Sequence, residues 1–163
     1  MPDFSIRGKW PYFGHQFCHM KRDPALIPLS RDHHQMLLLA QLLKQGAPPY
    51  KGLPTTAEGK AKYLEDAWEG VVLPHMEEEE SQLFPLARRL ENEEVTGMVD
   101  RLEKEHRQLG ALYDGVMQNP DRIAAQDALG RLLERHIRFE EREFFQLVQR
   151  KMPSEMLQVL LKK

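Results

Sequence analysis

Four long stretches of this chain carry apolar residues at the three-to-four-residue spacing of an α-helix. In the second stretch, Leu64, Trp68 and Val71 stand on one side, with acids and bases on the other. No strand-like alternation, repeat or low-complexity tract is evident. Long helices joined by short links favour an all-α fold, an antiparallel up-down-up-down four-helix bundle. The stretches cover about residues 30–46, 57–90, 92–118 and 122–151.

Capping residues and prolines set the expected limits of these helices. Ser30, Thr56 and Asp121 stand where the N-caps of the first, second and fourth helices are expected. Pro74 and Pro85 interrupt the second stretch. Each is expected to bend or break the helix, because proline removes a backbone donor.

The chain divides into an irregular start and a helical remainder. Residues 1–28 combine prolines with several aromatic side chains. This composition predicts an irregular N-terminal segment packed on the outside of the bundle. Residues 29–163 are expected to form the bundle itself, with a short last helix after Pro153.

Composition argues against several classes of protein. The chain has 163 residues and a formal net charge of −2, which gives no electrostatic case for binding nucleic acid or an anionic membrane. No apolar run approaches the ~20 residues needed to span a bilayer. Cys18 is the single cysteine, so an internal disulfide is excluded and a reducing compartment fits. We therefore expect a cytoplasmic protein without a nucleic-acid or membrane partner.

Each predicted helix carries a histidine, and the geometry of the helices brings these histidines to one level. At ~1.5 Å of rise per residue, the paths between successive histidines nearly cancel, with mismatches of roughly 3–8 Å. His75, His106 and His136 continue the apolar stripes of their helices and are expected to face inward. On the first helix the phase of the apolar residues favours His33, and His34 stays an alternative.

Two of these histidines have a glutamate one turn further along the same helix face. Glu79 follows His75, and Glu140 follows His136, in each case by four residues. A buried carboxylate is costly unless it is paired, and a metal cation is a natural partner. The two carboxylates stand on different helices and could each bridge two cations. Imidazole and carboxylate ligands together suit iron, manganese or zinc better than calcium or magnesium. The predicted metal ligands are His33, His75, Glu79, His106, His136 and Glu140.

Simpler interpretations exist for each feature taken alone. With 17 glutamates in the chain, a histidine often has one four residues later by chance. A plain helical bundle with core histidines and no metal is therefore the alternative, and the conjunction of level, phase and paired acids favours the metal. In the run "EEEE", the residues expected on the solvated surface are Glu77, Glu78 and Glu80.

A second group of metal-ligating residue types lies in the N-terminal segment. His15, Cys18 and His19 fall within five residues, but no partner group elsewhere completes a site. Cys18 also lacks an evident base, so nucleophilic catalysis has little support and no catalytic residue is assigned. The sequence leaves open whether the protein is an enzyme.

Four segments of the chain resemble the ligand helices of the hemerythrin-like, or HHE cation-binding, family. They are "LSRDHHQML", "LPHMEEEESQLFP", "EKEHRQL" and "RHIRFEEREFF", in order at fitting intervals from about residue 29 to 150. The resemblance implies a four-helix bundle around two iron ions joined by an oxo or hydroxo bridge, with manganese or zinc as alternative metals. It also implies that Glu79 and Glu140 are the bridging carboxylates.

The sequence departs from the oxygen-carrying members of that family in two places. Those carriers have a second histidine four residues after the one on the third helix, where this chain has Gly110. Their fourth helix places its acid five residues after the histidine, and here the spacing is four. The loss of a ligand implies a more open metal, which another histidine such as His34, a water or a substrate could complete.

The resemblance implies two classes of function. In the first, the metal pair binds or reacts with a small diatomic ligand, which would be oxygen, peroxide or nitric oxide. In the second, the metal centre controls a surface that an unknown protein partner recognises, as in a regulatory or iron-handling module, with the N-terminal segment as the element that responds.

Overall fold

The computed structural model describes residues 21–161, and within this range the chain is helical without strands. The prediction of an all-α fold is therefore confirmed. The α-helices are α1 (Ile27–Leu43), α2 (Ala57–Ala67), α3 (Leu73–Glu78), α4 (Phe84–Arg88), α5 (Glu93–Gln118), α6 (Ile123–Phe139), α7 (Phe145–Lys151) and α8 (Ser154–Leu157). Three π turns, η2 (Trp68–Val72), η3 (Glu79–Leu83) and η4 (Glu140–Phe144), join some of them, and 3-10 turns occupy Pro24–Leu26 and Gln158–Leu161.

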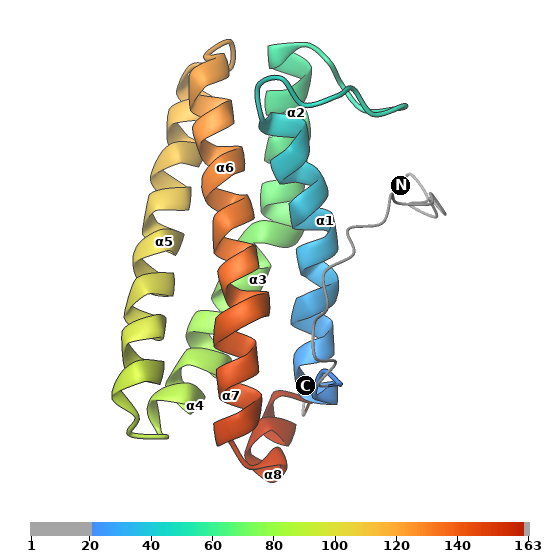
Figure 1. The fold of residues 1–163 in the computed structure, drawn as a ribbon. Helices are drawn as coiled ribbons and strands as arrows, with labels where there is room; N and C mark the ends of the chain where they lie inside the picture. Colours follow the sequence, from blue (N-terminus) through green and yellow to red (C-terminus); the bar gives the residue numbers. More distant parts are fainter. Residues whose placement is uncertain (1–20, 162–163) are drawn as a thin grey trace.

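Of these α-helices, α1 to α7 form four columns, and α8 follows the last of them. The first column is α1, and the third is α5. The second runs without a break from α2 through η2, α3 and η3 into α4, and the fourth runs from α6 through η4 into α7. The columns lie side by side, and the links between them lie at the two ends of the molecule (Figure 1). No helix in residues 21–161 is long and apolar enough to cross a membrane.

The helix starts agree with the predicted caps in part. The Thr56 hydroxyl accepts a hydrogen bond from the Gly59 amide at 3.1 Å, as predicted. The predictions for Ser30 and Asp121 are wrong. Ser30 lies inside α1, which starts at Ile27 with proline in its first turn, and α6 starts after Arg122 without a side-chain cap. Proline tolerates the first turn of a helix because its missing amide has no helical partner there.

The two prolines of the second column do not end its helix. Each stands just after a π turn, Pro74 after η2 and Pro85 after η3. The wider turn relieves the clash that proline makes with the carbonyl of the turn before it. The fourth column has the same kind of turn at Glu140–Phe144, where no proline is present.

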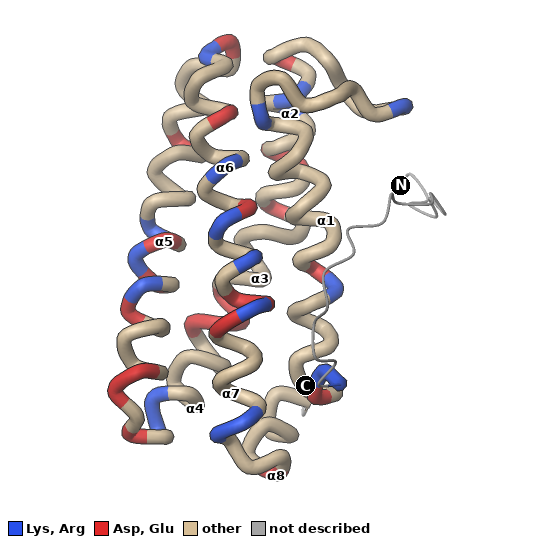
Figure 2. The backbone as a smooth tube through the Cα atoms, in the orientation of Figure 1, with Lys and Arg blue, Asp and Glu red and all other residues tan. Residues whose placement is uncertain are grey.

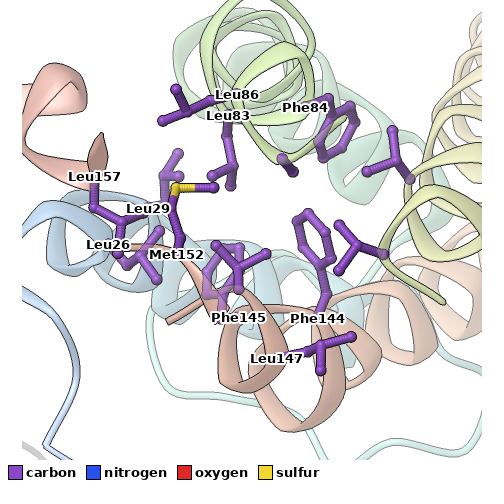
Figure 3. Packing of buried hydrophobic residues seen from close by; sticks show 14 of the residues in the cluster. Leu26, Leu29, Leu83, Phe84, Leu86, Phe144, Phe145, Leu147, Met152 and Leu157 are labelled. Carbon is purple, nitrogen blue, oxygen red and sulfur yellow. The ribbon is translucent and has the colours of Figure 1, made fainter. Parts of the chain in front are cut away.

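A layer of buried polar residues divides the apolar core into two clusters. One cluster, which includes Leu29, Phe84 and Phe144, fills one end of the columns (Figure 3). The other includes Met36 and Leu133 and fills the opposite end. In every column the change from one cluster to the other falls beside a predicted histidine ligand. The buried polar residues of the layer are His33, His75, Glu79, His106, His136 and Glu140.

The first and fourth columns pack closely at Gly130. A Cβ atom at this position would lie 2.6 Å from the Ala40 carbonyl oxygen, which is backbone and cannot rotate away. We expect Gly130→Ala to lower the free energy of unfolding by about 1–3 kcal/mol, because the two helices must separate.

The matched control is Gly97→Ala on α5, where an added Cβ meets nothing within 4 Å. This change should raise the stability by up to about 1 kcal/mol through helix propensity alone. Urea unfolding of both variants measures the difference. Equal stabilisation by the two substitutions would contradict the close approach at Gly130.

Candidate metal centre

The structure brings all six predicted ligands into one buried cluster. His33 comes from α1, His75 from α3 and His106 from α5. His136 comes from α6, Glu79 from η3 and Glu140 from η4. All six side chains are buried, the most accessible being only 4% exposed. His34 is exposed on the outside of α1, so of the two histidines considered there it is His33 that reaches the cluster.

The donor atoms fall into two groups that share both carboxylates. One group joins His33 and His75 to the two glutamates, and the other joins His106 and His136 to the same two glutamates. In each group the donor atoms lie within 4.8 Å of one another. The arrangement therefore offers two adjacent cation positions, each with two imidazoles and two shared carboxylates.

The carboxylate oxygens face histidine nitrogens from different columns. Glu140 directs one oxygen to His33 Nε2 at 3.1 Å and the other to His136 Nε2 at 3.2 Å. One oxygen of Glu79 lies 3.6 Å from His75 Nε2 and 3.4 Å from His106 Nε2. These contacts are near but poorly aligned, and both oxygens of each glutamate are left without a hydrogen bond. A cation at the centre would satisfy these buried oxygens.

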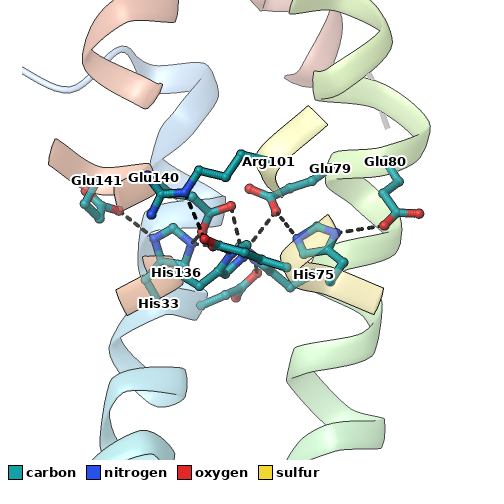
Figure 4. A network of polar contacts seen from close by, with 11 residues as sticks. His33, His75, Glu79, Glu80, Arg101, His136, Glu140 and Glu141 are labelled. Atoms are coloured by element: carbon teal, nitrogen blue, oxygen red, sulfur yellow. Dashed lines mark hydrogen bonds and ion pairs between the residues drawn. The ribbon is translucent and has the colours of Figure 1, made fainter. Parts of the chain in front are cut away.

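Four further carboxylates hold the histidines from behind, and we call them the outer carboxylates (Figure 4). Each accepts a hydrogen bond from the Nδ1–H of one histidine. This bond leaves the Nε2 lone pair directed at the centre, as metal-binding histidines require. The pairs are His33–Glu141 at 2.7 Å, His75–Asp32 at 3.4 Å, His106–Glu80 at 2.8 Å and His136–Glu105 at 2.9 Å.

The outer carboxylates come one from each column, from α1, η3, α5 and η4. Figure 2 shows acidic positions along all four columns. The prediction that Glu80 is plain surface is therefore wrong, because this half-exposed side chain holds His106. Arginines stand behind two of the four carboxylates. Arg101 donates to Glu105 at 2.9 Å, and Arg22 donates to Glu141.

The cluster is built from two short sequence patterns, each used twice, which the helical periodicity alone does not reveal. An acid precedes the histidine in "DH" at residues 32–33 and in "EH" at residues 105–106. The pattern H-x3-E-E-x3-F occurs at residues 75–84 and 136–145. In both copies the first glutamate starts a π turn and the second is an outer carboxylate.

Matching rings complete this two-fold arrangement. Phe145 stacks on His33 with the ring centroids 5.5 Å apart, and Phe84 stacks on His106 at 5.6 Å. Tyr113, on the same helix as His106, stacks on Trp68 with the ring centroids 4.4 Å apart, as a packing residue would. His15, Cys18 and His19 lie outside the described residues.

The charges of the cluster favour the protonated forms of His33 and His136 when no metal is bound. Burial opposes the charge on His33, but Glu140 and Glu141 outweigh burial and raise its pKa from 6.5 to about 9. Burial is likewise outweighed at His136, where Glu140 and Glu105 raise the pKa to about 10. Burial would raise the pKa of Glu140, yet the same histidines hold it well below its ordinary value. A metal must therefore displace protons from this cluster.

The outer carboxylate Glu105 offers a direct test of this support. We expect Glu105→Gln to weaken metal binding by about 10–100-fold, since the neutral amide no longer holds and polarises His136. Competition with a chelating dye for Co²⁺ measures the affinity. Glu103→Gln is the matched control on the same helix, because Glu103 contacts Arg88 at 3.2 Å and not a histidine. An equal effect of both changes would show that only the overall charge matters.

Comparison with known proteins places this geometry in a family. A model of the hemerythrin HHE cation binding domain matches residues 25–148, which is most of the chain and a range that contains all six predicted ligands. Neither the comparison with curated proteins nor that with solved structures finds a match. The buried histidine and glutamate groups independently support a metal-binding role. On the match and the geometry together, the chain belongs to the hemerythrin HHE cation-binding domain family.

Proposed function

We propose that the four columns form an antiparallel, up-down-up-down bundle that holds two iron ions at its centre. His33 and His75 would bind one ion, His106 and His136 the other, and Glu79 and Glu140 would bridge them through their oxygens. The observation that carries this proposal is the pair of fully buried glutamates, shared by both donor groups and without hydrogen bonds. Two such carboxylates need a compensating positive charge in an apolar core, which protonated histidines supply in the metal-free protein and a metal pair would supply in their place.

Iron suits this donor set, with manganese or zinc as alternatives. Imidazole and carboxylate ligands favour first-row metals over calcium and magnesium. Each ion would have four protein donors, which leaves room for an external bridge and a small ligand. A bound iron pair would supply reversible electron transfer to that ligand. We therefore propose that the protein binds or reacts with a diatomic ligand, namely oxygen, peroxide or nitric oxide.

The residues around the centre fit such a role. Trp68 and Leu133 are buried in one of the two apolar clusters, and Leu102 and Phe144 in the other. These apolar clusters exclude bulk water and limit entry to small molecules. The outer carboxylates keep the imidazoles oriented before and after a ligand arrives. A cytoplasmic location and the absence of a nucleic-acid partner stay predictions from composition.

Metal analysis and absorption spectroscopy test the function together. Protein purified without added metal should contain about two iron ions per chain, as a paired site requires. Its aerobic spectrum should show near-ultraviolet charge-transfer bands. The reduced protein should develop new absorption bands when nitric oxide is added. An iron-loaded protein with a silent, unresponsive spectrum would refute the diatomic-ligand function.

One contact favours the alternative of a metal-dependent regulatory or iron-handling module. Arg22, in the described part of the N-terminal segment, donates to Glu141 and lies over the Phe145 ring, 5.2 Å from its centroid. Since Glu141 holds His33, metal binding and the position of this segment can influence each other. If so, deleting residues 1–20 should abolish binding of a protein partner while the metal content stays the same. Unchanged partner binding after the deletion would count against this alternative.

A further inference from the structure

The two halves of the centre differ one helical turn after the histidine of the "DH" and "EH" patterns, that is, after His33 and His106. Four residues after His33 the chain has Leu37, a partly buried side chain packed against the core. Four residues after His106 it has Gly110. A Cβ atom built on Gly110 meets nothing within 4 Å. The two-fold pattern is therefore filled on one side and open on the other.

The open side is a hollow of about 320 Å³ between α5 and the second column. His106 and Met76 line it together with the stacked pair Trp68 and Tyr113, and Gly110 forms part of its wall. His106 is itself one of the donors at the centre, and its Nε2 has no hydrogen-bond partner. Met76 is buried beside His106 in the wall of the hollow, and methionine is a flexible side chain that can shift to admit a small molecule.

The equivalent surface on the other side, between α1 and α6, is closed. Gly130 brings the two helices together at Ala40, as described above. Glu134 accepts hydrogen bonds from Gln41 at 3.2 Å and from Lys44 at 2.6 Å, which ties the same two helices. The repeated patterns give each of these residues a counterpart in the other half of the centre. Leu73 is the counterpart of Glu134, and Asp114 is the counterpart of Gln41. Both counterparts line the open hollow. The hollow therefore lies on the His106 side of the centre, while the corresponding helices on the His33 side are held together.

We propose that external ligands reach the centre through this hollow and bind at the cation position of His106 and His136. The inference rests on the proposed metal pair and names the ion that takes the ligand. The rim of the hollow carries Glu77, Glu80 and Asp114 against a single Arg107. This excess of negative charge disfavours anions, so the ligand class is small, uncharged donor molecules.

The test uses imidazole as the probe on the Co²⁺-loaded full chain, whose visible spectrum reports the coordination of the metal. We expect Gly110→Leu to weaken imidazole binding by about tenfold or more, because the leucine occupies the hollow. Gly97→Leu on the same helix, also with free space around its Cβ, should bind imidazole like the unchanged protein. Both variants should load the same amount of Co²⁺.

A crystal structure of the imidazole complex fixes the position of the ligand. Imidazole beside His106 and His136 supports the proposal, and imidazole beside His33 overturns it. Equal imidazole binding by Gly110→Leu and the unchanged protein, or no binding to the unchanged protein, also overturns it. Failure to load about two Co²⁺ ions would refute the metal pair itself. That result appears in the metal analysis before any imidazole is added, so the two failures are distinguishable.

Discussion

Replacing Glu140 by alanine is expected to abolish the metal pair, with bound metal falling from about two ions per chain to below one. Glu140 belongs to both donor groups and contacts histidines of both. Its loss removes a ligand from each cation position and half of the negative charge that the two glutamates supply there. Elemental analysis of the purified variant measures the result directly.

Two further variants make this prediction specific. His75 belongs to a single donor group, so His75→Ala should empty one position first and leave close to one ion. Glu143→Ala is the matched control, because Glu143 lies three residues after Glu140 on the exposed face of η4. It should keep the full metal content. Retention of both ions by Glu140→Ala would show that the carboxylates are not shared ligands.

Metal loading is expected to raise the melting temperature by roughly 10 °C or more, and the difference should widen as the pH rises from 6 to 8.5. The apoprotein holds protons on His33 and His136, whose pKa values are raised to about 9 and about 10. Stability from these raised pKa values is fully present below the ordinary value of 6.5. It is lost progressively as the pH rises towards the folded values.

The metal-loaded protein should respond in the opposite sense. A metal takes the place of the two protons, so binding becomes tighter as protons become scarcer at higher pH. The lowered pKa of Glu140 contributes stability above its ordinary value of 4.5, and this contribution is constant over the range tested. Thermal unfolding of the Zn²⁺-loaded and metal-free protein at several pH values measures the gap. A gap that narrows with rising pH would contradict the protonated apo cluster.

The helices and the six inward residues could be predicted because their signals are local. The spacing of apolar residues states which face of each helix is buried, and the histidines and two glutamates stand on that face. The number of residues between successive histidines gives the distance travelled along the helices. The common level of the four histidines could therefore be predicted from the sequence. The same reasoning misplaced the start of α1 by one turn, since the proline within its first turn was read as a barrier.

The outer carboxylates could not be predicted in this way. Glu80 looks like any surface acid in its own helix, and its role depends on His106 from another column. The repeated patterns "DH"/"EH" and H-x3-E-E-x3-F were present in the sequence and would have indicated these residues. The π turn at Glu140–Phe144 had no proline to signal it.

The sequence by itself determined the helical class, the family and the six residues that can meet, because periodicity and spacing act within one helix. Only the tertiary structure decided which carboxylate supports which histidine, and that the space beside Gly110 stays open while α1 and α6 close at Gly130. The physical reason is that these contacts join different columns. Their distances depend on how closely the helices approach, which no single helix specifies.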